Sequence, residues 1–257
     1  MNISLAAEPI FYLGAFTVTN SLLVAVLVMI MLSFVAILLR RRQFAAVPSG
    51  LQNVTEATME GALSFVESVV GDRARARRFL PLVATIFFFV LLSNWFGLLP
   101  GVGTIGLWQV HDGHRVLVPF LRSASADLNG TLAIALISVL GTQLFGIVVL
   151  GFWKHAAKYV NIKGLVQHFS FQNLIMFFVG LLELVSEVAK VVSFSFRLFG
   201  NVFAGEVLLI VISALVPFIA PLPFLVLEVF VGLVQALVFS LLTLVFLTIA
   251  TVEHEAH

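Results

Sequence analysis

The chain has 257 residues, of which 61% are hydrophobic and only 11% are charged. A soluble domain carries roughly 45–50% apolar and 25% charged residues, so this apolar excess indicates a membrane protein. The formal net charge of +1 gives no electrostatic support for a nucleic-acid partner, and the lack of cysteine excludes disulfides and thiolate metal sites.

Three apolar runs are long enough to cross a bilayer as helices. A hydrocarbon core of about 30 Å needs about 20 apolar residues in a helix. The first run, at 21–39, contains no charged residue and is followed by Arg40. The others lie at 79–100 and at 128–153. We therefore predict three spans that run roughly perpendicular to the membrane.

Basic residues indicate which side of the membrane each loop faces. Arginine clusters at 40–42 and 73–78 lie at the two ends of the segment between the first and second spans, and such clusters favour the cytoplasm. On this basis the N-terminal residues 1–20 and the loop 101–126 are external. With five membrane-crossing elements in all, the C-terminus is predicted to be cytoplasmic.

The segment 43–78 is less apolar than the spans. Within it, Leu63, Val66 and Val70 recur at helical spacing, while charged side chains take other positions. This pattern is typical of an amphipathic helix that lies on a membrane surface. We predict one cytoplasmic surface helix here.

The last third of the chain does not divide into spans of ordinary length. The apolar run 171–216 would form a helix about 69 Å long, more than twice the hydrocarbon thickness. Either it contains two spans with a turn near Gly200, or it is one strongly tilted helix. The proline-rich segment 217–223 is the stronger helix breaker, and a second apolar run follows at 224–252. We favour a hairpin of two long tilted helices, and an all-α integral membrane protein overall.

Polar residues in this hairpin follow a helical pattern. At about 100° per residue, five of them form one stripe along the first helix: Glu183, Glu187, Lys190, Arg197 and Asn201. Glu206 lies on the opposite side of that helix, and Glu228 and Gln235 share a face of the second. In an antiparallel hairpin, Arg197 then faces Gln235, and Glu206 faces Glu228. These pairs favour a polar path between the helices.

Arg197 is the strongest candidate for a functional residue. The residues around it, 191–200, are otherwise apolar or small. An arginine inside a bilayer costs roughly 2.5–3.5 kcal/mol on insertion scales. A purely structural role would have to outweigh that cost, so we predict that the charge serves a function.

The other polar positions leave simpler interpretations open. Glu183, Glu187 and Lys190 can extend from a span end into the interface, and the last two can form an i, i+3 ion pair. Asn201 and Gln235 can join helices by hydrogen bonds. We predict no cofactor and no metal site, since the histidines of the external loop and of the C-terminal tail are expected to be solvated.

Four segments, in order along the chain, resemble subunit a of the membrane sector of F-type ATP synthase. They are Leu92–Gly101, Ala126–Ala133, Ser193–Glu206 and Leu233–Phe239. The third contains the Arg-Leu-Phe-Gly-Asn core typical of that family. The resemblance runs from about residue 80 to the C-terminus, and the earlier part matches only in layout.

The resemblance implies a stator that holds its tilted hairpin against a rotating ring of c subunits, each with one membrane carboxylate. It also implies peripheral-stalk b subunits as partners, contact with membrane lipid, a bacterial plasma membrane location and no catalytic site on this chain. Protons would reach the ring through an outer half-channel and leave through an inner one, so that their movement is coupled to rotation and ATP synthesis. The choice between H⁺ and Na⁺ stays open.

Roles for single residues follow from the same resemblance. Arg197 would be the essential stator charge between the two half-channels. Glu206 and Glu228 would belong to the outer path, and Glu183 to the inner one. The ion path as a whole would comprise Glu183, Lys190, Asn201, Glu206, Glu228 and Gln235.

One feature departs from the family pattern. Many bacterial relatives have histidine at the position of Glu228, and mitochondrial relatives have it at the position of Glu206, whereas this chain has glutamate at both. Two facing carboxylates do not readily ionise together in a low-dielectric site, so we expect one of them to bind a proton near neutral pH.

Two other classes of function are compatible with a multispan chain. An ion-coupled secondary transporter would show internal repeats and helices broken at mid-membrane, and the sequence shows neither. A structural or assembly protein would not need Arg197 within the membrane. Copurification with a ring of small hairpin proteins and a soluble catalytic head would distinguish the stator from both.

Overall fold

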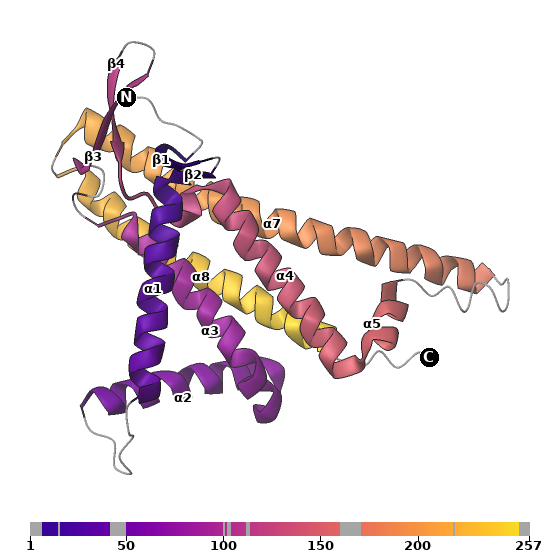
Figure 1. Ribbon diagram of the computed structural model, residues 1–257. Helices are drawn as coiled ribbons and strands as arrows, with labels where there is room; N and C mark the ends of the chain where they lie inside the picture. The colour runs from indigo at the N-terminus through magenta and orange to yellow at the C-terminus, as the bar shows by residue number, and fades with distance from the viewer. Residues whose placement is uncertain are drawn as a thin grey trace.

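The computed structural model describes residues 7–14, 16–41, 50–99, 101, 104–111, 114–159, 171–217 and 219–251. Its helices are α1 (Asn20–Arg41), α2 (Leu51–Val70), α3 (Arg73–Phe96), α4 (Leu128–Leu150), α5 (Phe152–Tyr159), α7 (Phe171–Leu215) and α8 (Pro221–Thr251), with one 3₁₀ turn, η2 (Ala124–Ala126). Five of these helices, α1, α3, α4, α7 and α8, are long and apolar enough to cross a membrane. The predicted all-α integral membrane fold is confirmed (Figure 1).

Two small antiparallel hairpins accompany the helices, and neither was predicted from the sequence. β1 (Pro9–Leu13) pairs with β2 (Phe16–Thr19), and β3 (Gly106–His111) pairs with β4 (His114–Pro119). In Figure 1 both hairpins lie at the end of the molecule opposite α2. They therefore occupy the parts of the chain that the arginine pattern predicts to be external.

The surface helix and the second span meet earlier than predicted. α2 ends at Val70, and Gly71 follows in the left-handed region with φ 74°. Asp72 caps α3 by accepting a hydrogen bond from the Ala74 N–H at 2.8 Å, which lowers the pKa of this carboxyl. The arginines from Arg73 onward therefore form the first turns of the span. Apolar runs mark where hydrocarbon begins, whereas a glycine and a capping aspartate determine where helices end and begin.

The third span ends at Leu150 and not at residue 153. Gly151 follows with φ 85°, a conformation that only glycine adopts readily, and its N–H still donates to the Ile147 carbonyl at 2.9 Å. Phe152 then begins the short helix α5 in a new direction. The apolar pattern alone continued through this break because Phe152 and Trp153 are themselves apolar.

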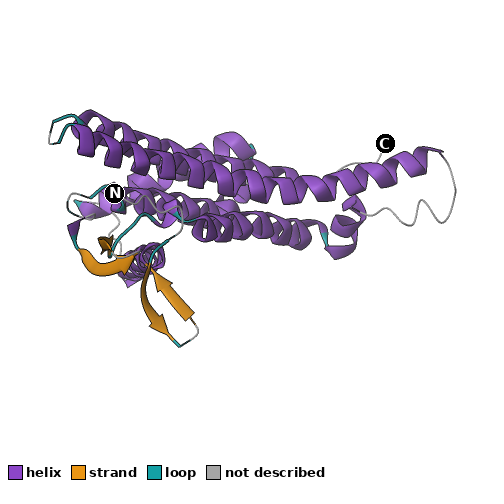
Figure 2. Ribbon diagram, turned by 90° about the horizontal axis from the view of Figure 1, so that it is seen from above, coloured by secondary structure: helices purple, strands orange, loops and turns teal. Residues whose placement is uncertain are grey.

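The C-terminal hairpin consists of two long helices that lie side by side (Figure 2). α7 is continuous over 45 residues, which selects the single long helix over two spans with a turn near Gly200. α8 begins at Pro221, three residues before the predicted start at 224. Proline is tolerated in the first turn of a helix because the N–H group that it lacks has no intrahelical partner there.

Buried apolar residues join the spans into one body. One cluster links α2, α3 and α8, with Phe79 and Leu247 almost fully buried. A second links α3, α4, α7 and α8 around Val90, Leu198 and Ala236. Because lipid chains are as apolar as these side chains, close packing and polar contacts contribute more here than in a soluble core.

Hydroxyl groups connect α4 to both helices of the hairpin. Thr131 and Ser195 lie 3.2 Å apart between α4 and α7, and Ser138 and Thr243 lie 2.7 Å apart between α4 and α8. All four side chains are buried. These contacts place the hairpin relative to the third span.

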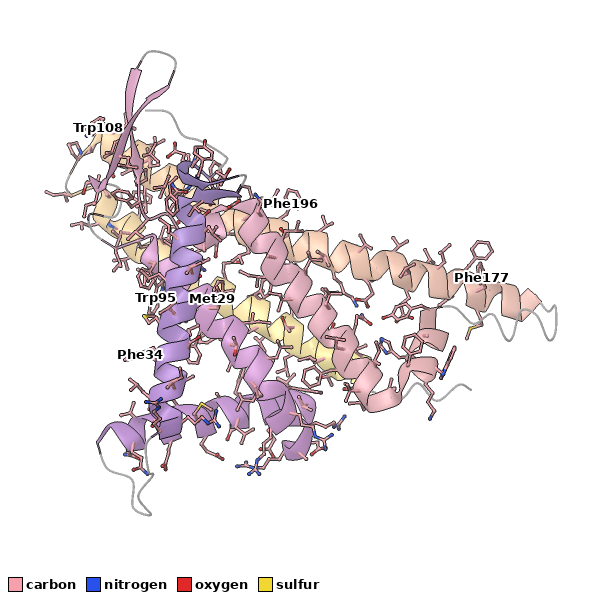
Figure 3. The ribbon with its side chains drawn as sticks, viewed as in Figure 1. Met29, Phe34, Trp95, Trp108, Phe177 and Phe196 are labelled. Carbon is pink, nitrogen blue, oxygen red and sulfur yellow. The ribbon has the colours of Figure 1, made fainter. Side chains whose placement is uncertain are left out.

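Large apolar side chains project from the outside of the molecule (Figure 3). Met29 and Phe34 on α1 and Phe196 on α7 are each more than half exposed, at 52%, 60% and 57%. Exposed apolar side chains along whole helices require lipid or a protein partner around them.

Candidate functional site

Arg197 lies on an exposed side of α7. Its Nη2 donates to Ser193 Oγ, one turn earlier, at 3.5 Å, a long hydrogen bond. Within the described part of the chain it forms no ion pair. Phe194 and Leu198, on the neighbouring face, are buried in the cluster with α3, α4 and α8, and the Phe194 ring packs on Phe239. Burial of that face turns the arginine outward.

The two amides predicted to hold this guanidinium do not form hydrogen bonds with it in the described structure. Asn201 is exposed on α7, and Gln235 is half-buried on α8. Among the described residues, neither forms a side-chain hydrogen bond with Arg197. Their proposed role stays a prediction.

Glu206 pairs with a residue that the sequence analysis did not single out. Arg122 Nε lies 3.0 Å from Oε1 and 3.1 Å from Oε2 of Glu206, and Nη2 lies 3.0 Å from Oε2. The arginine side chain is only 7% exposed. Its Cζ also lies 6.0 Å from the centre of the Phe203 ring. The carboxylate of Glu206 is thus neutralised by a buried cation from the loop before η2.

Glu228 lies close to this pair without joining it. Its buried carboxyl group packs so tightly against Gly205 that a Cβ at that glycine would overlap it. The hairpin therefore brings Glu228 to the level of Glu206, as predicted from the numbering. The expectation that the two carboxyls form a pair of their own is corrected, because Glu206 bonds to Arg122, which attracts it, whereas a second carboxylate would repel it.

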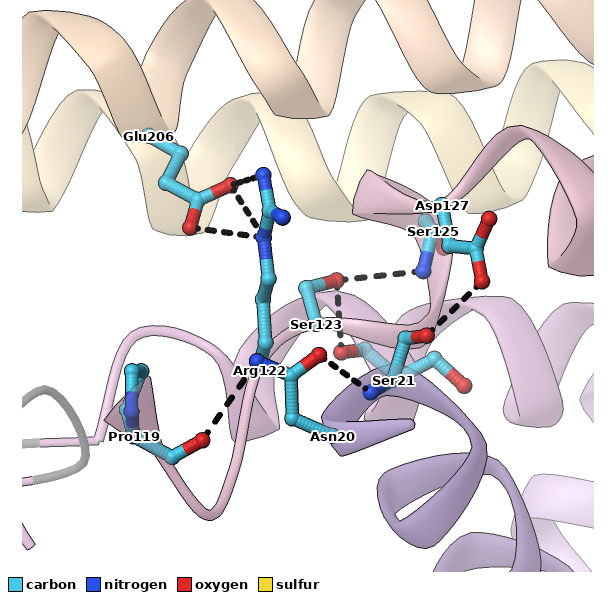
Figure 4. A network of polar contacts seen from close by, with 9 residues as sticks. Asn20, Ser21, Pro119, Arg122, Ser123, Ser125, Asp127 and Glu206 are labelled. Carbon is cyan, nitrogen blue, oxygen red and sulfur yellow. Dashed lines mark hydrogen bonds and ion pairs between the residues drawn. The ribbon is translucent and has the colours of Figure 1, made fainter. Parts of the chain in front are cut away.

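A polar network fixes the segment that carries Arg122 (Figure 4). Ser123 Oγ donates to the Ser93 carbonyl of α3 at 3.0 Å and accepts from the Ser125 N–H at 3.3 Å. Ser21 Oγ of α1 donates to Asp127 Oδ2 at 2.8 Å. The segment that follows the arginine is thereby bonded to two spans, α3 and α1.

Close backbone packing holds the same loop. A Cβ at Gly97 would lie 2.7 Å from the Cβ of Ser123, and one at Gly130 would lie 2.7 Å from the Ala124 carbonyl oxygen. Both distances are shorter than real Cβ contacts. The two glycines therefore let the loop approach α3 and α4 closely enough for Arg122 to reach Glu206.

The sequence carried only a weak signal for Arg122. It is one of two arginines in the predicted external loop 101–126, with Arg115, and no periodicity connects it to Glu206 on α7, 84 residues later. Its position just before the family-like segment at 126–133 was the single available hint. The long-range fold was needed to show its partner.

The N-terminal half of α7 carries a second polar cluster. Lys190 Nζ donates to Glu187 Oε1 at 2.6 Å, so the i, i+3 ion pair considered from the sequence is present. The same Nζ lies 4.5 Å from the centre of the Phe246 ring. Glu187 Oε2 is buried and has no hydrogen-bond partner among the described residues. This end of the stripe is polar and partly enclosed.

Helix α5 contributes groups to this cluster that the sequence analysis missed. His155, 4% exposed, and Tyr159 both bond to the side-chain oxygen of Gln143 on α4, at 2.7 and 2.8 Å. Burial raises the pKa of Tyr159 to about 12, and the negative charges of Glu187 and Glu183 add to the effect. The tyrosine hydroxyl is therefore a neutral donor beside the two predicted glutamates.

The structure bears on a metal site only in the part of the chain that it describes. Among these residues no group of three or more histidine, cysteine, aspartate or glutamate side chains could hold a metal ion. The predicted solvated tail at 253–257 lies outside the described residues.

Comparison with known proteins identifies the family. The family model described as ATP synthase A chain matches residues 21–248. The chain belongs to the ATP synthase subunit a family. Proteins named ATP synthase subunit a are similar to it along most of their length. The one from Campylobacter jejuni is 37% identical over 88% of each chain, and the one from Moorella thermoacetica is 32% identical over 93% of each.

Family membership agrees with the resemblance seen in the sequence. The chain is a multi-pass subunit of the membrane sector of an ATP synthase, and members of the subunit a family work in a complex with other ATP synthase subunits. The matched region contains all the polar hairpin positions and also Arg122.

Proposed function

We propose that this chain is the stator ion-channel subunit of a rotary F-type ATP synthase in a bacterial plasma membrane. It provides two aqueous half-channels that load and unload protons on the carboxylates of a c-ring, so that proton flow drives rotation and ATP synthesis. The observation that carries the proposal is the Arg197 cation, which lies on an open side of a membrane helix and has no ion pair with any of the residues that the structure describes.

The open side of α7 is suited to close contact with a partner helix. Besides Arg197 it exposes Ser193, Gly200, Asn201 and Ala204, all small or uncharged. Small residues allow helices to approach closely within a membrane. A ring of c subunits that each carry one carboxylate would supply the missing anion each time one passes.

The two polar clusters give this surface two access paths. Glu206 and Glu228 lie near the turn of the hairpin and form the outer path, whereas Glu183 and Lys190 lie toward the other end and belong to the inner path. Asn201 and Gln235 flank the arginine between them. This arrangement requires an external N-terminus and a cytoplasmic C-terminus, and b subunits of the peripheral stalk would hold the chain against rotation.

The chemistry of arginine suits a position between the two paths. A guanidinium stays charged at any accessible pH, so an arriving ring carboxylate is drawn into its ionised form and loses its proton. The same charge repels a proton that would cross directly from one path to the other. Each charge that crosses supplies about 2.3 kcal/mol per 100 mV, so a rotor has to sum several of them for one ATP.

Replacing Arg197 with alanine tests the proposal. ATP-driven proton pumping in membrane vesicles should fall to background, while the chain still inserts and binds the ring, because the change removes an unfavourable membrane charge. Passive proton permeability, measured after the catalytic head is stripped, should rise. Arg78→Ala, an exposed arginine at the start of α3, is the matched control and should pump normally. An Arg197→Ala complex that pumps like the parent would overturn the proposal.

Purification separates this function from the alternatives. A tagged chain should bring with it a ring of small hairpin proteins and a soluble ATPase. A secondary transporter would purify alone and would still move its ion with no ATPase present.

A further inference from the structure

The ion pair between Arg122 and Glu206 divides the outer cluster into two chemically different carboxyl groups. Glu206 has a guanidinium against both of its oxygens, in a side-on arrangement with three contacts of 3.0–3.1 Å. Glu228, within the described part of the chain, has neither an ion pair nor a hydrogen bond, and its carboxyl lies against Gly205. One carboxyl is compensated and the other is not.

The arginine is held too firmly to serve both glutamates in turn. Ser123, the next residue, is bonded to α3, and Asp127 is bonded to α1. Gly97 lets the backbone of the loop lie directly on α3. The guanidinium itself is buried and packs near the Phe203 ring. Such a fixed, bidentate contact suits arginine, whose planar group loses little freedom when it binds.

We propose that Arg122 is a positioning residue of the outer path, which holds Glu206 as a fixed carboxylate and leaves Glu228 as the group that exchanges protons. This inference rests on the proposed function and assigns separate tasks within it. Glu228 takes a proton from the external side and passes it to the next acceptor, the arriving ring carboxylate. The Arg122–Glu206 pair, neutral as a whole, neither gains nor loses one.

This assignment accounts for the glutamates at both 206 and 228. Two uncompensated carboxylates at the same level of a membrane would repel each other and would share a proton between them. With Arg122 present, the total charge of the site changes only when Glu228 is protonated. The charged groups around the site in the described structure are Arg122 from the loop, Glu206 on α7, Glu228 on α8 and, further along the loop, Asp127.

Charge-removal variants of the complete ATP synthase test the inference. In Glu206→Gln, the fixed guanidinium loses its carboxylate, and its uncompensated positive charge near Glu228 favours the ionised form of that group, which slows proton transfer through the outer path in either direction. In Arg122→Gln, two uncompensated carboxyls remain. Each single change should reduce the initial rate of ATP-driven pumping by about tenfold, a usual size for the coupling of a close charge pair, and should alter its pH profile. The double variant Arg122→Gln/Glu206→Gln should restore most of the rate and the parent pH profile.

Two further measurements make the result decisive. Arg122→Lys keeps the charge and should retain more activity than Arg122→Gln, and Arg78→Gln serves as the surface control. Each initial pumping rate is divided by the amount of assembled complex. A loss of assembly is thereby separated from a loss of proton transfer. If Arg122→Gln does not assemble, the double variant still decides: assembly with near-parent pumping supports the inference, and assembly without pumping overturns it.

Failure of this inference differs from failure of the proposed function. If the double variant pumps no better than either single variant, while Arg197→Ala still abolishes pumping, Arg122 has no positioning role but the stator function stands. None of the Arg122 or Glu206 variants should raise passive proton permeability, because Arg197 is intact in all of them.

Discussion

Arg122 and Arg197 both lie close to the C-terminal hairpin, and their surroundings are opposite. Arg122 is buried, touches both oxygens of Glu206 and is carried by a loop that hydrogen bonds fix to α1 and α3. Arg197 is exposed on α7, and its one hydrogen bond in the described structure is a 3.5 Å contact with Ser193.

The difference shows how the two charges are compensated. A buried cation needs an anion, and Arg122 finds it within the same chain. The described part of the chain provides no anion for Arg197, which agrees with the proposal that a ring carboxylate pairs with it in passing. A cation that forms an ion pair within the chain holds its neighbours in place. A cation that forms none in the described structure can pair with the carboxylate of a moving partner.

The largest expected effect comes from Arg197→Lys. Although the formal charge is kept, coupled pumping should fall nearly as far as in the alanine variant, because an ammonium lacks the planar fork and can lose its proton when desolvated. ATP-driven pumping and ATP synthesis in vesicles measure this. If Arg197→Lys pumps as well as the parent while Arg122→Lys does not, Arg122 and not Arg197 is the arginine that requires a guanidinium.

Glu228→Gln should have the next largest effect. Glutamine has nearly the same shape but cannot bind and release a proton as a carboxylate does, so proton transfer through the outer path should slow strongly in both directions while the complex still assembles. Glu56→Gln, at an exposed position on α2, is a matched control that should leave pumping unchanged. Normal pumping by Glu228→Gln across the range from about pH 6 to about pH 9 would remove this residue from the path.

Gly205→Ala should give the smallest of these effects. The added methyl group would overlap the Glu228 carboxyl, and a flexible side chain can move aside, so we expect partial loss of pumping with the complex intact. Gly61→Ala, at a helical glycine with open space around it, is the control. An unaltered rate in Gly205→Ala would mean that the exact placement of Glu228 matters little.

Local chemistry made much of the fold predictable. The span near 21–39 and the long apolar runs of the hairpin follow directly from the scarcity of charge, because nothing but a helix satisfies backbone groups in lipid. The boundaries were less predictable. Gly71 with Asp72, Gly151, and Pro221 each set a helix end through backbone conformation, and the apolar pattern passes over such positions.

The candidate site likewise has residues that the local sequence pattern predicts and residues that it does not. Arg197 and the polar stripe of α7 were visible because helical periodicity relates residues on one helix. Arg122, Gln143 and His155 were missed because their partners lie on other elements, and only tertiary packing brings them together. The hairpin numbering placed Glu228 beside Glu206 correctly, but it contained no information about a third element that approaches from the loop.

The length of α7 has a consequence for the path of an ion. Its apolar part, Ile175–Leu215, has 41 residues and spans about 62 Å along its axis, twice the thickness of the hydrocarbon. If this part stays within a 30 Å layer, each residue changes depth by only about 0.7 Å and moves mostly sideways. Glu183 and Glu206 would then be separated more around the circumference of a ring than across the membrane. An ion that enters beside one and leaves beside the other has to be carried around, and the slope of a single helix sets how far.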